Sequence, residues 1–256
     1  MKIADNLEML ELPMKVMGME RMVYPTCMWD DDNVILVDTG IPDNLEMIKK
    51  QMDAAGISFA RLTKIVATQQ DIDHIAGIKG IMSEKSEVIV LAHAEDKPYI
   101  EGEKKVKRLN SKFMDRIKDL PKDERLKIID MFENSCVNVN RTLVDGEVLP
   151  YCGGISVIHT PGHTPGHICL YHQKSKTLIA GDALNILDGQ LVGPNKDSMS
   201  EDKMNAIDAI ETLKKLMDYD IVNVITYHGG LFSDNPNEGI KALIRDRKFY
   251  SYKRND

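Results

Sequence analysis

The sequence lacks the features that mark membrane, secreted and nucleic-acid-binding proteins. No uninterrupted apolar run reaches the roughly 20 residues of a membrane-spanning helix. Asp5 and Glu8 lie where a signal peptide would need an apolar stretch. The net charge of −7 disfavours general binding to nucleic acid or to an anionic membrane. We therefore expect a cytoplasmic protein that has neither a nucleic acid nor a membrane as its partner.

Paired cysteines are also missing. The chain has four cysteines, and no two of them have Cys-x-x-Cys spacing, so neither a zinc ribbon nor a redox dithiol is indicated. We expect reduced cysteines that pack as small apolar residues. The sequence also contains no phosphate-binding loop and no dinucleotide fingerprint. These absences exclude the commonest nucleotide-binding enzymes.

The chain does contain two similar successions of strand and helix patterns, residues 7–136 and 141–256. The apolar run 33–40 predicts a strand that is buried on both faces, and an amphipathic helix is predicted at 41–53. No linker or low-complexity segment divides the two successions. We therefore predict a single domain, residues 1–256, of mixed α/β class, in which two sheets face each other and helices cover the outside.

Residues 94–136 differ from the rest because they are charged and have a helical pattern without any strand. They predict a helical insertion that covers an edge of the fold or the mouth of a site. Its basic stretch, residues 104–112, is interpreted as a solvated helix face, and the alternatives are a substrate-facing lid or a contact in a homodimer. Elsewhere we predict three strands within residues 7–38, and helices at 200–219 and 237–252.

The segment Gln69–His74 follows an apolar run, residues 63–68, that predicts a buried strand. Asp71, Asp73 and His74 can all bind a divalent metal, and Gln69 offers a neutral amide oxygen. A turn can direct side chains at positions i, i+2 and i+3 toward one point, which a regular strand cannot. The alternative is a helix N-terminus, where aspartates cap free N–H groups.

Three further ligand candidates follow strand-like runs. The prolines and glycines between His159 and His167 exclude a helix and predict a kinked loop that presents His163 at its apex. Asp182 follows Gly181 at the end of an apolar strand, where a carboxylate is costly to bury unless it is paired or bound to metal. His228 precedes two glycines that allow close approach of the backbone. His93 and His172 have no such context and are interpreted as surface or packing residues.

Together these motifs resemble those of the metallo-β-lactamase-fold hydrolase superfamily. The family pattern Thr-His-x-His-x-Asp-His corresponds to Thr68–His74, and its Pro-Gly-His-Thr loop corresponds to 161–164. Gly181-Asp182 and Tyr227-His228-Gly229 match the later motifs, and Val37–Gly40 is similar to the family's Asp-Thr-Gly strand end. The resemblance implies an αββα sandwich with the site along the edge between the sheets.

The resemblance also implies the ligand set. Gln69, Asp71 and His163 would form a first metal position; Asp73, His74 and His228 would form a second; and Asp182 would bridge them. Asp38 is a candidate to hold the second ring nitrogen of a ligand histidine.

Gln69 and Asp71 stand where the family has histidines. This oxygen-richer set favours iron or manganese relative to zinc. The Gln69 position should bind a metal less tightly than a histidine would. Either one or two divalent transition metals are therefore expected, and a single metal would occupy the second position.

The predicted function is metal-assisted hydrolysis of a small ester, lactone, thioester or related substrate, with Asp73 as both ligand and catalytic residue that orients water or passes on a proton. Asn185 stands where many lactonases of the family have a tyrosine, and no glutathione-binding C-terminal region is identified, so no one substrate is favoured. A non-catalytic metal- or metabolite-binding descendant and an iron-dependent redox protein are the alternatives.

Overall fold

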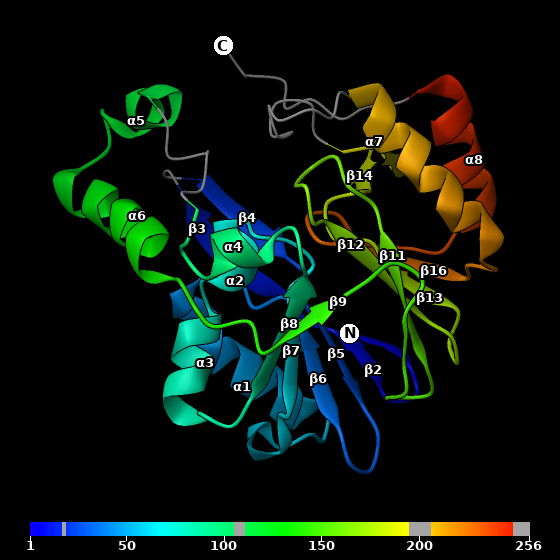
Figure 1. The fold of residues 1–256 in the computed structure, drawn as a ribbon, viewed down its shortest axis with the longest axis horizontal. Coiled ribbons are helices and arrows are strands. Elements are labelled where there is room, and N and C mark those ends of the chain that lie inside the picture. Colours follow the sequence, from blue (N-terminus) through cyan, green and yellow to red (C-terminus); the bar gives the residue numbers. More distant parts are fainter. Residues whose placement is uncertain (17–18, 105–110, 195–205, 248–256) are drawn as a thin grey trace.

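The computed structural model describes residues 1–16, 19–104, 111–194 and 206–247. Two sheets form the centre of the molecule (Figure 1). The first has seven strands in the order β1-β2-β5-β6-β7-β8-β9, and the second has six in the order β10-β11-β12-β13-β16-β17. The strands of the first sheet are β1 (Lys2–Ala4), β2 (Leu7–Met9), β5 (Thr26–Trp29), β6 (Val34–Val37), β7 (Lys64–Val66), β8 (Ile89–His93) and β9 (Arg141–Leu143). Those of the second are β10 (Val148–Leu149), β11 (Ile155–His159), β12 (Ile168–His172), β13 (Thr177–Ile179), β16 (Asn223–Thr226) and β17 (Gly230–Phe232).

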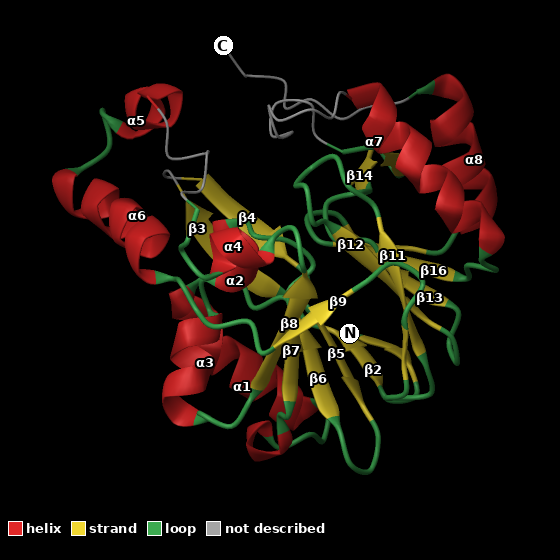
Figure 2. Ribbon diagram, viewed as in Figure 1, coloured by secondary structure: helices red, strands yellow, loops and turns green. Residues whose placement is uncertain are grey.

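Helices cover the outer faces of both sheets (Figure 2). On the side of the first sheet lie α1 (Leu45–Ala54), α2 (Ile72–Ile75), α3 (Ile78–Glu84), and the short 3₁₀ helices η1 (Pro42–Asn44) and η2 (Phe59–Arg61). On the side of the second sheet lie α7 (Ala206–Thr212), η4 (Leu213–Asp218) and α8 (Pro236–Asp246). The predicted αββα sandwich is confirmed.

Strand β6 shows why the layers form. All four of its residues are buried, and they alternate between two cores. Val34 and Leu36 pack with Ile48 of α1, whereas Ile35 and Val37 face the second sheet. Successive side chains of a strand point to opposite faces, so a continuous apolar run fills both layers. Full burial of each such side chain contributes about 1.5–3 kcal/mol.

The parallel strand pairs determine where the polar side chains gather. Strands β6, β7 and β8 are parallel in the first sheet, and β13 is parallel to β16 in the second. The carboxyl ends of parallel strands meet at the same edge of a sheet, which is where open α/β sheets bind ligands. Asp38 follows β6, the Gln69–His74 segment follows β7, Asp182 follows β13 and His228 follows β16.

Several predicted elements differ from the observed ones. Residues 7–38 contain five strands rather than three, because β3 (Leu12–Val16) and β4 (Met19–Val23) pair only with each other as a hairpin beside the first sheet. A second such hairpin is formed by β14 (Asn185–Leu187) and β15 (Gln190–Val192). The predicted helix at 200–219 is observed from 206 and becomes 3₁₀ at Leu213; its first part, 200–205, lies outside the described residues, as does 248–252 of the predicted final helix.

Between β8 and β9, the described residues form α4 (Lys97–Ile100), α5 (Ser111–Ile117) and α6 (Lys122–Asn134), with no strand. The Nζ atom of Lys79 in α3 donates to the carbonyl of Asn134, so α6 ends against the helix layer of the first sheet. Most of the basic stretch, residues 105–110, lies outside the described residues. Within the described ranges, no helix combines the length and the apolar character that crossing a membrane requires.

Candidate metal centre

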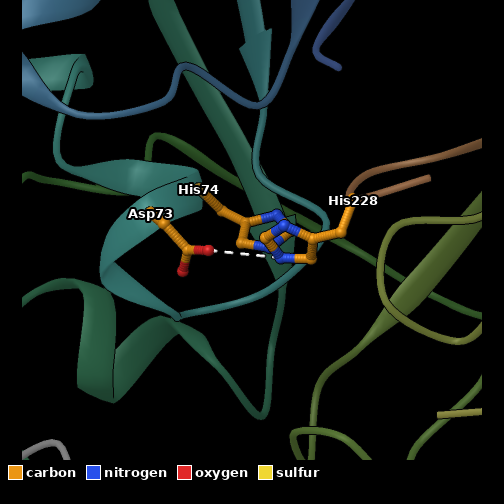
Figure 3. Close-up of side chains that lie close together, drawn as sticks. All are labelled: Asp73, His74 and His228. Carbon is orange, nitrogen blue, oxygen red and sulfur yellow. Dashed lines mark ion pairs between the residues drawn. The ribbon is translucent and has the colours of Figure 1, made fainter. Parts of the chain in front are cut away.

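Asp73, His74 and His228 come together at the edge between the two sheets (Figure 3). Asp73 and His74 lie in α2, and His228 follows β16. The Nε2 atom of His228 lies 3.3 Å from Oδ2 of Asp73, and one potential ligand atom from each residue lies within 4.8 Å of the others. These are the residues that the resemblance implied for the second metal position.

Asp71, His163 and Asp182 form a neighbouring group. The Nε2 atom of His163 lies 2.8 Å from Oδ2 of Asp71 and 3.1 Å from Oδ2 of Asp182. Asp71 occupies the N-cap position of α2, but its side chain makes no capping hydrogen bond. Its carboxylate instead lies against His163, as a ligand of a shared centre would.

Asp182 stands between the two groups. Its Oδ2 atom lies 3.4 Å from Nε2 of His74 as well as 3.1 Å from His163, and its Oδ1 atom lies 3.4 Å from Nε2 of His228. One carboxylate therefore faces the Nε2 atoms of all three histidines. This is the place that the resemblance implied for a bridging ligand.

Gln69 is also part of the centre. Its Nε2 atom lies 2.7 Å from Nε2 of His74 and 2.9 Å from Oδ2 of Asp182, whereas its Oε1 atom is buried and makes no hydrogen bond. A buried amide oxygen without a partner is costly. A half-turn of the amide exchanges the two atoms and directs Oε1 into the centre, where it would bind a metal ion or accept a hydrogen bond from a protonated His74.

Asp38 binds the ring nitrogen of His74 that faces away from the centre. Its Oδ2 atom lies 2.9 Å from Nδ1 of His74, and it is itself fixed by the main-chain N–H (2.8 Å) and hydroxyl (2.7 Å) of Thr68. Because a carboxylate accepts hydrogen bonds, Nδ1 carries a proton, and Nε2 is the ring nitrogen that faces the centre. Ligand histidines are commonly held in this way. Asp38 thus has the position expected for it.

The loop that carries His163 is fixed by the two histidines at its ends. The ring of His159 donates from Nε2 to the carbonyl of Pro165 (2.9 Å), and Nε2 of His167 accepts the main-chain N–H of Asp182 (3.1 Å). Burial lowers the pKa of His167 to about 3, so this ring is neutral. The His159 ring thus bridges the loop and the His167 ring holds the backbone of Asp182, whereas His163 alone of the three belongs to a candidate ligand group.

Asp96 is a residue of the site that sequence reasoning missed. This fully buried carboxylate accepts hydrogen bonds from the main-chain N–H of Gln70 (3.0 Å), the hydroxyl of Thr164 (2.6 Å) and the main-chain N–H of Gly166 (2.7 Å). It thereby joins the Gln69–His74 segment to the His163 loop. Its position shortly after β8, beside β7, repeats the pattern of Asp38 and Asp71, and this signal could have identified it.

The charges in the centre support one another. Burial alone would raise the pKa of Asp73, but its hydrogen bond to His228 and the charges of His74 and His228 hold that pKa below the ordinary value. Burial would lower the pKa of His228, but Asp182 and Asp73 outweigh it and raise the pKa to about 10. Burial likewise opposes the charge of His74, whose pKa Asp38 and Asp182 raise well above its ordinary value.

The donor set suits a divalent transition metal. The second group supplies two imidazoles and a carboxylate, the first supplies one imidazole and a carboxylate beside an amide, and Asp182 is available to both. Imidazoles with carboxylates bind zinc, iron and manganese. The two histidines without sequence context pack elsewhere: His93 stacks on His159 with centroids 3.9 Å apart, and buried His172 donates from Nε2 to the carbonyl of Cys152.

A family model described as the metallo-β-lactamase superfamily matches residues 19–222. The chain belongs to this superfamily. A probable metallo-hydrolase, YqjP from Bacillus subtilis (strain 168), is 27% identical over 229 residues, which cover 84% of this chain and 68% of the relative. A hydroxyacylglutathione hydrolase from Francisella philomiragia is 24% identical over 162 residues, which cover 63% of this chain but 47% of the relative.

Solved structures of the superfamily share the fold. A metallo-β-lactamase family protein from Thermus thermophilus superposes with a TM-score of 0.72 at 22% identity, covering 96% of this chain and 80% of that one. A Cronobacter sakazakii metallo-β-lactamase described by its HARLDQ motif superposes with a TM-score of 0.64 at 16% identity, covering 88% and 79%. At these identities the likeness establishes the fold alone. The curated relatives add that the chain is similar to proteins described as metallo-hydrolases.

Proposed function

We propose that the protein is a metal-dependent hydrolase that acts on a small ester, lactone or thioester. The observation that carries the proposal is the convergence of two ligand groups on one shared carboxylate, with the Nε2 atoms of His74, His163 and His228 all within 3.4 Å of Asp182. A structural core has no need for three imidazoles and three carboxylates in one place, because their desolvation is costly.

A divalent metal bound here would supply an activated water and a Lewis acid for the substrate's carbonyl oxygen. The second position would be occupied before the first, because in the first position Gln69 offers only a neutral amide. Asp73, His74, His228 and Asp182 would be its ligands.

The residues of the second position are also the more exposed ones. The side chains of Asp73 and His228 are 22% and 15% exposed, whereas those of Asp71 and His163 are both 3% exposed. The centre therefore opens to solvent on the side of Asp73. Asp73 would therefore be the carboxylate closest to an arriving water and substrate, and its low pKa keeps it ionised, as a metal ligand that orients a water molecule must be.

The test is metal analysis combined with turnover of a panel of small esters, lactones and thioesters. We expect at least one transition metal per chain, loss of turnover on chelation, and recovery with zinc, iron or manganese. Asp73→Ala should lose turnover, and the exposed Asp188→Ala, on the β14–β15 turn, is the control. Turnover that survives chelation, or persists in Asp73→Ala, would contradict the proposal.

A further inference from the structure

Tyr227, the residue before His228, lies at the centre of the second ligand group. It is 2% exposed, and its ring stacks on the imidazole of His74 with centroids 3.8 Å apart and an interplanar angle of 27°. Its hydroxyl donates to the main-chain carbonyl of Asp73 at 2.5 Å. Its ring also meets that of His228 edge to face at 5.1 Å. One side chain therefore contacts all three residues of the group.

The backbone of Tyr227 is fixed to both sheets. Its N–H donates to the carbonyl of Gly181 (3.1 Å), the residue before Asp182, and its carbonyl accepts the N–H of Tyr24 (2.9 Å) between β4 and β5. The residue therefore cannot shift without moving the segments that carry Asp182 and His228. Its ring reaches from the second sheet to α2, which follows the first sheet.

The hydroxyl of Tyr227 replaces a bond that a longer helix would make. In a continuous helix the carbonyl of Asp73 would accept the N–H of Gly77. Helix α2 ends at Ile75, and the N–H of Gly77 donates to the carbonyl of Gly40 instead (3.1 Å). The Asp73 carbonyl thus depends on the Tyr227 hydroxyl for its hydrogen bond. Because this bond fixes the backbone of Asp73, it also fixes the direction of the Asp73 side chain.

The stacking contact completes the restraint on His74. Asp38 holds Nδ1 of the imidazole and Gln69 lies 2.7 Å from its Nε2, but both contacts are made at the edge of the ring and neither packs against its faces. The ring of Tyr227 packs against the imidazole face and fixes its plane. These contacts together orient Nε2 toward the centre.

We propose that Tyr227 is a positioning residue for metal at the second position: its ring fixes the plane of His74, and its hydroxyl fixes the turn that carries Asp73. The inference rests on the proposed metal site, but it does not depend on what the protein hydrolyses. It assigns to Tyr227 a share of the metal affinity although the tyrosine itself is not a ligand.

Two substitutions separate the parts of this role. Tyr227→Phe removes only the hydroxyl, and Tyr227→Leu also removes the stacked ring. The matched control is Tyr171→Phe, because Tyr171 is also buried and also donates its hydroxyl to a main-chain carbonyl, that of Asp220 (2.8 Å), away from the centre.

The experiment titrates each metal-free protein with less than one equivalent of Co²⁺, and records its dissociation constant, its visible d–d spectrum and the Tm of the metal-free chain. We expect Tyr227→Phe to bind cobalt about 10-fold more weakly and with a changed spectrum. Tyr227→Leu should bind it about 100-fold more weakly. Losing a residue that supports a metal ligand typically weakens metal binding by about 10- to 100-fold. Tyr171→Phe should lower the Tm and leave affinity and spectrum unchanged.

Wild-type affinity and spectrum in Tyr227→Phe would overturn the inference, as would equal changes in Tyr171→Phe. If Tyr227→Leu does not fold, Tyr227→Phe decides the question alone. Failure of the wild-type protein to bind cobalt would overturn the proposed function together with this inference. Cobalt binding that is indifferent to Tyr227 would overturn the inference only.

Discussion

The two candidate metal positions share Asp182 but differ in their ligands, their exposure and the way they are held. The first has Gln69 and Asp71 where the superfamily pattern has histidines, and Asp71 and His163 are almost completely buried. The second retains Asp73, His74 and His228, and it opens to solvent through Asp73 and His228. The position that keeps the family's residue types is therefore also the more exposed of the two.

The departures from the family pattern are thus confined to the buried first position, whereas the more exposed second position keeps the family's residue types. The carboxylate of Asp71 and the imidazole of His163 lie 2.8 Å apart, so they can also stabilise each other as a pair. His74 and His228, by contrast, each lie 3.4 Å from an oxygen of Asp182. We infer that the second position binds metal more tightly than the first.

The largest expected effect comes from removing a ligand of each position in turn. His74→Ala should weaken binding of the first equivalent of metal by more than about 100-fold, since losing a residue that only supports a ligand already costs about 10- to 100-fold. Asp71→Ala should leave the first equivalent close to wild type and weaken only a second one. Titration with Co²⁺ or Zn²⁺ against a competing chelator measures both constants. Equal losses in the two variants would remove the distinction between the positions.

The pH dependence of metal binding should be nearly as large. In the metal-free protein the pKa of His228 is about 10 and that of His74 is also raised, so a metal arriving at neutral pH must displace protons. Affinity should rise with pH, by about tenfold per pH unit for each proton released, until the pH exceeds these values. Calorimetry at pH 7 in two buffers of different ionisation enthalpy counts the protons.

The same pKa shifts make the opposite prediction for the stability of the metal-free fold. A histidine whose pKa is raised on folding stabilises the folded state fully below its unfolded value, near pH 6.5, and loses that contribution as the pH rises toward about 10. Urea unfolding of metal-free protein between pH 6 and pH 10 should therefore show falling stability, and His228→Gln should flatten the profile. An unchanged profile in that variant would show that His228 is not paired as described.

Gln69→His should reduce the difference between the two positions. An imidazole at residue 69 replaces a weak neutral ligand, so binding of the second equivalent should strengthen by about 10-fold or more, on the scale of a single good ligand contact. Gln173→His, on the exposed turn after β12, controls for adventitious binding by an added histidine. If both variants behave alike, residue 69 does not belong to the first position.

The smallest expected effect on metal binding comes from Asp96→Asn. The amide cannot accept from all three donors, so we expect a loss of about 1–3 kcal/mol in the free energy of unfolding and only a modest weakening of the first position. Asp30→Asn is the control, since Asp30 also accepts main-chain N–H groups, from Cys152 and Asn33, far from the centre. Only Asp96→Asn should affect the second equivalent of metal.

The effect of Asp96→Asn should also depend on pH. Burial raises the pKa of Asp96 to about 7, so its protonated form contributes stability at low pH that is lost as the pH rises from about 4 through 7. The difference in unfolding free energy between wild type and Asp96→Asn should therefore be larger at pH 5 than at pH 8. A difference that widens at pH 8 would mean that the carboxylate, not the carboxylic acid, is the stabilising form.

The candidate ligands could be predicted from the sequence because they follow strands and lie beside residues that restrict the backbone. His163 lies between prolines and glycines, and Asp71, Asp73 and His74 follow a buried strand, so their places could be predicted from local pattern. Asp96 also follows a strand, but neither its role nor that of Tyr227 could be predicted from local pattern. The partners of Asp96 lie 26 to 70 residues away, and Tyr227 acts through contacts between the sheets.

In the fold, too, features that depend on local sequence pattern could be predicted, and features that depend on distant contacts could not. The sandwich follows from the repeated strand and helix patterns, and the continuous apolar run of β6 identified a strand buried on both faces. The β3–β4 hairpin was missed because its strands are short and pair only with each other, so their separation from the first sheet depends on packing rather than on local pattern.

The division of the ligands between the two sheets has a mechanical consequence. Gln69–His74 belong to the half of the chain that builds the first sheet, and His163, Asp182 and His228 belong to the half that builds the second. An ion bound by residues of both halves would cross-link the two sheets reversibly. At 100 times its dissociation constant such an ion adds about 2.7 kcal/mol to the stability of the fold. Hydrogen exchange along β7 and β13 would report the tightening, so metal supply would set how firmly the two layers close.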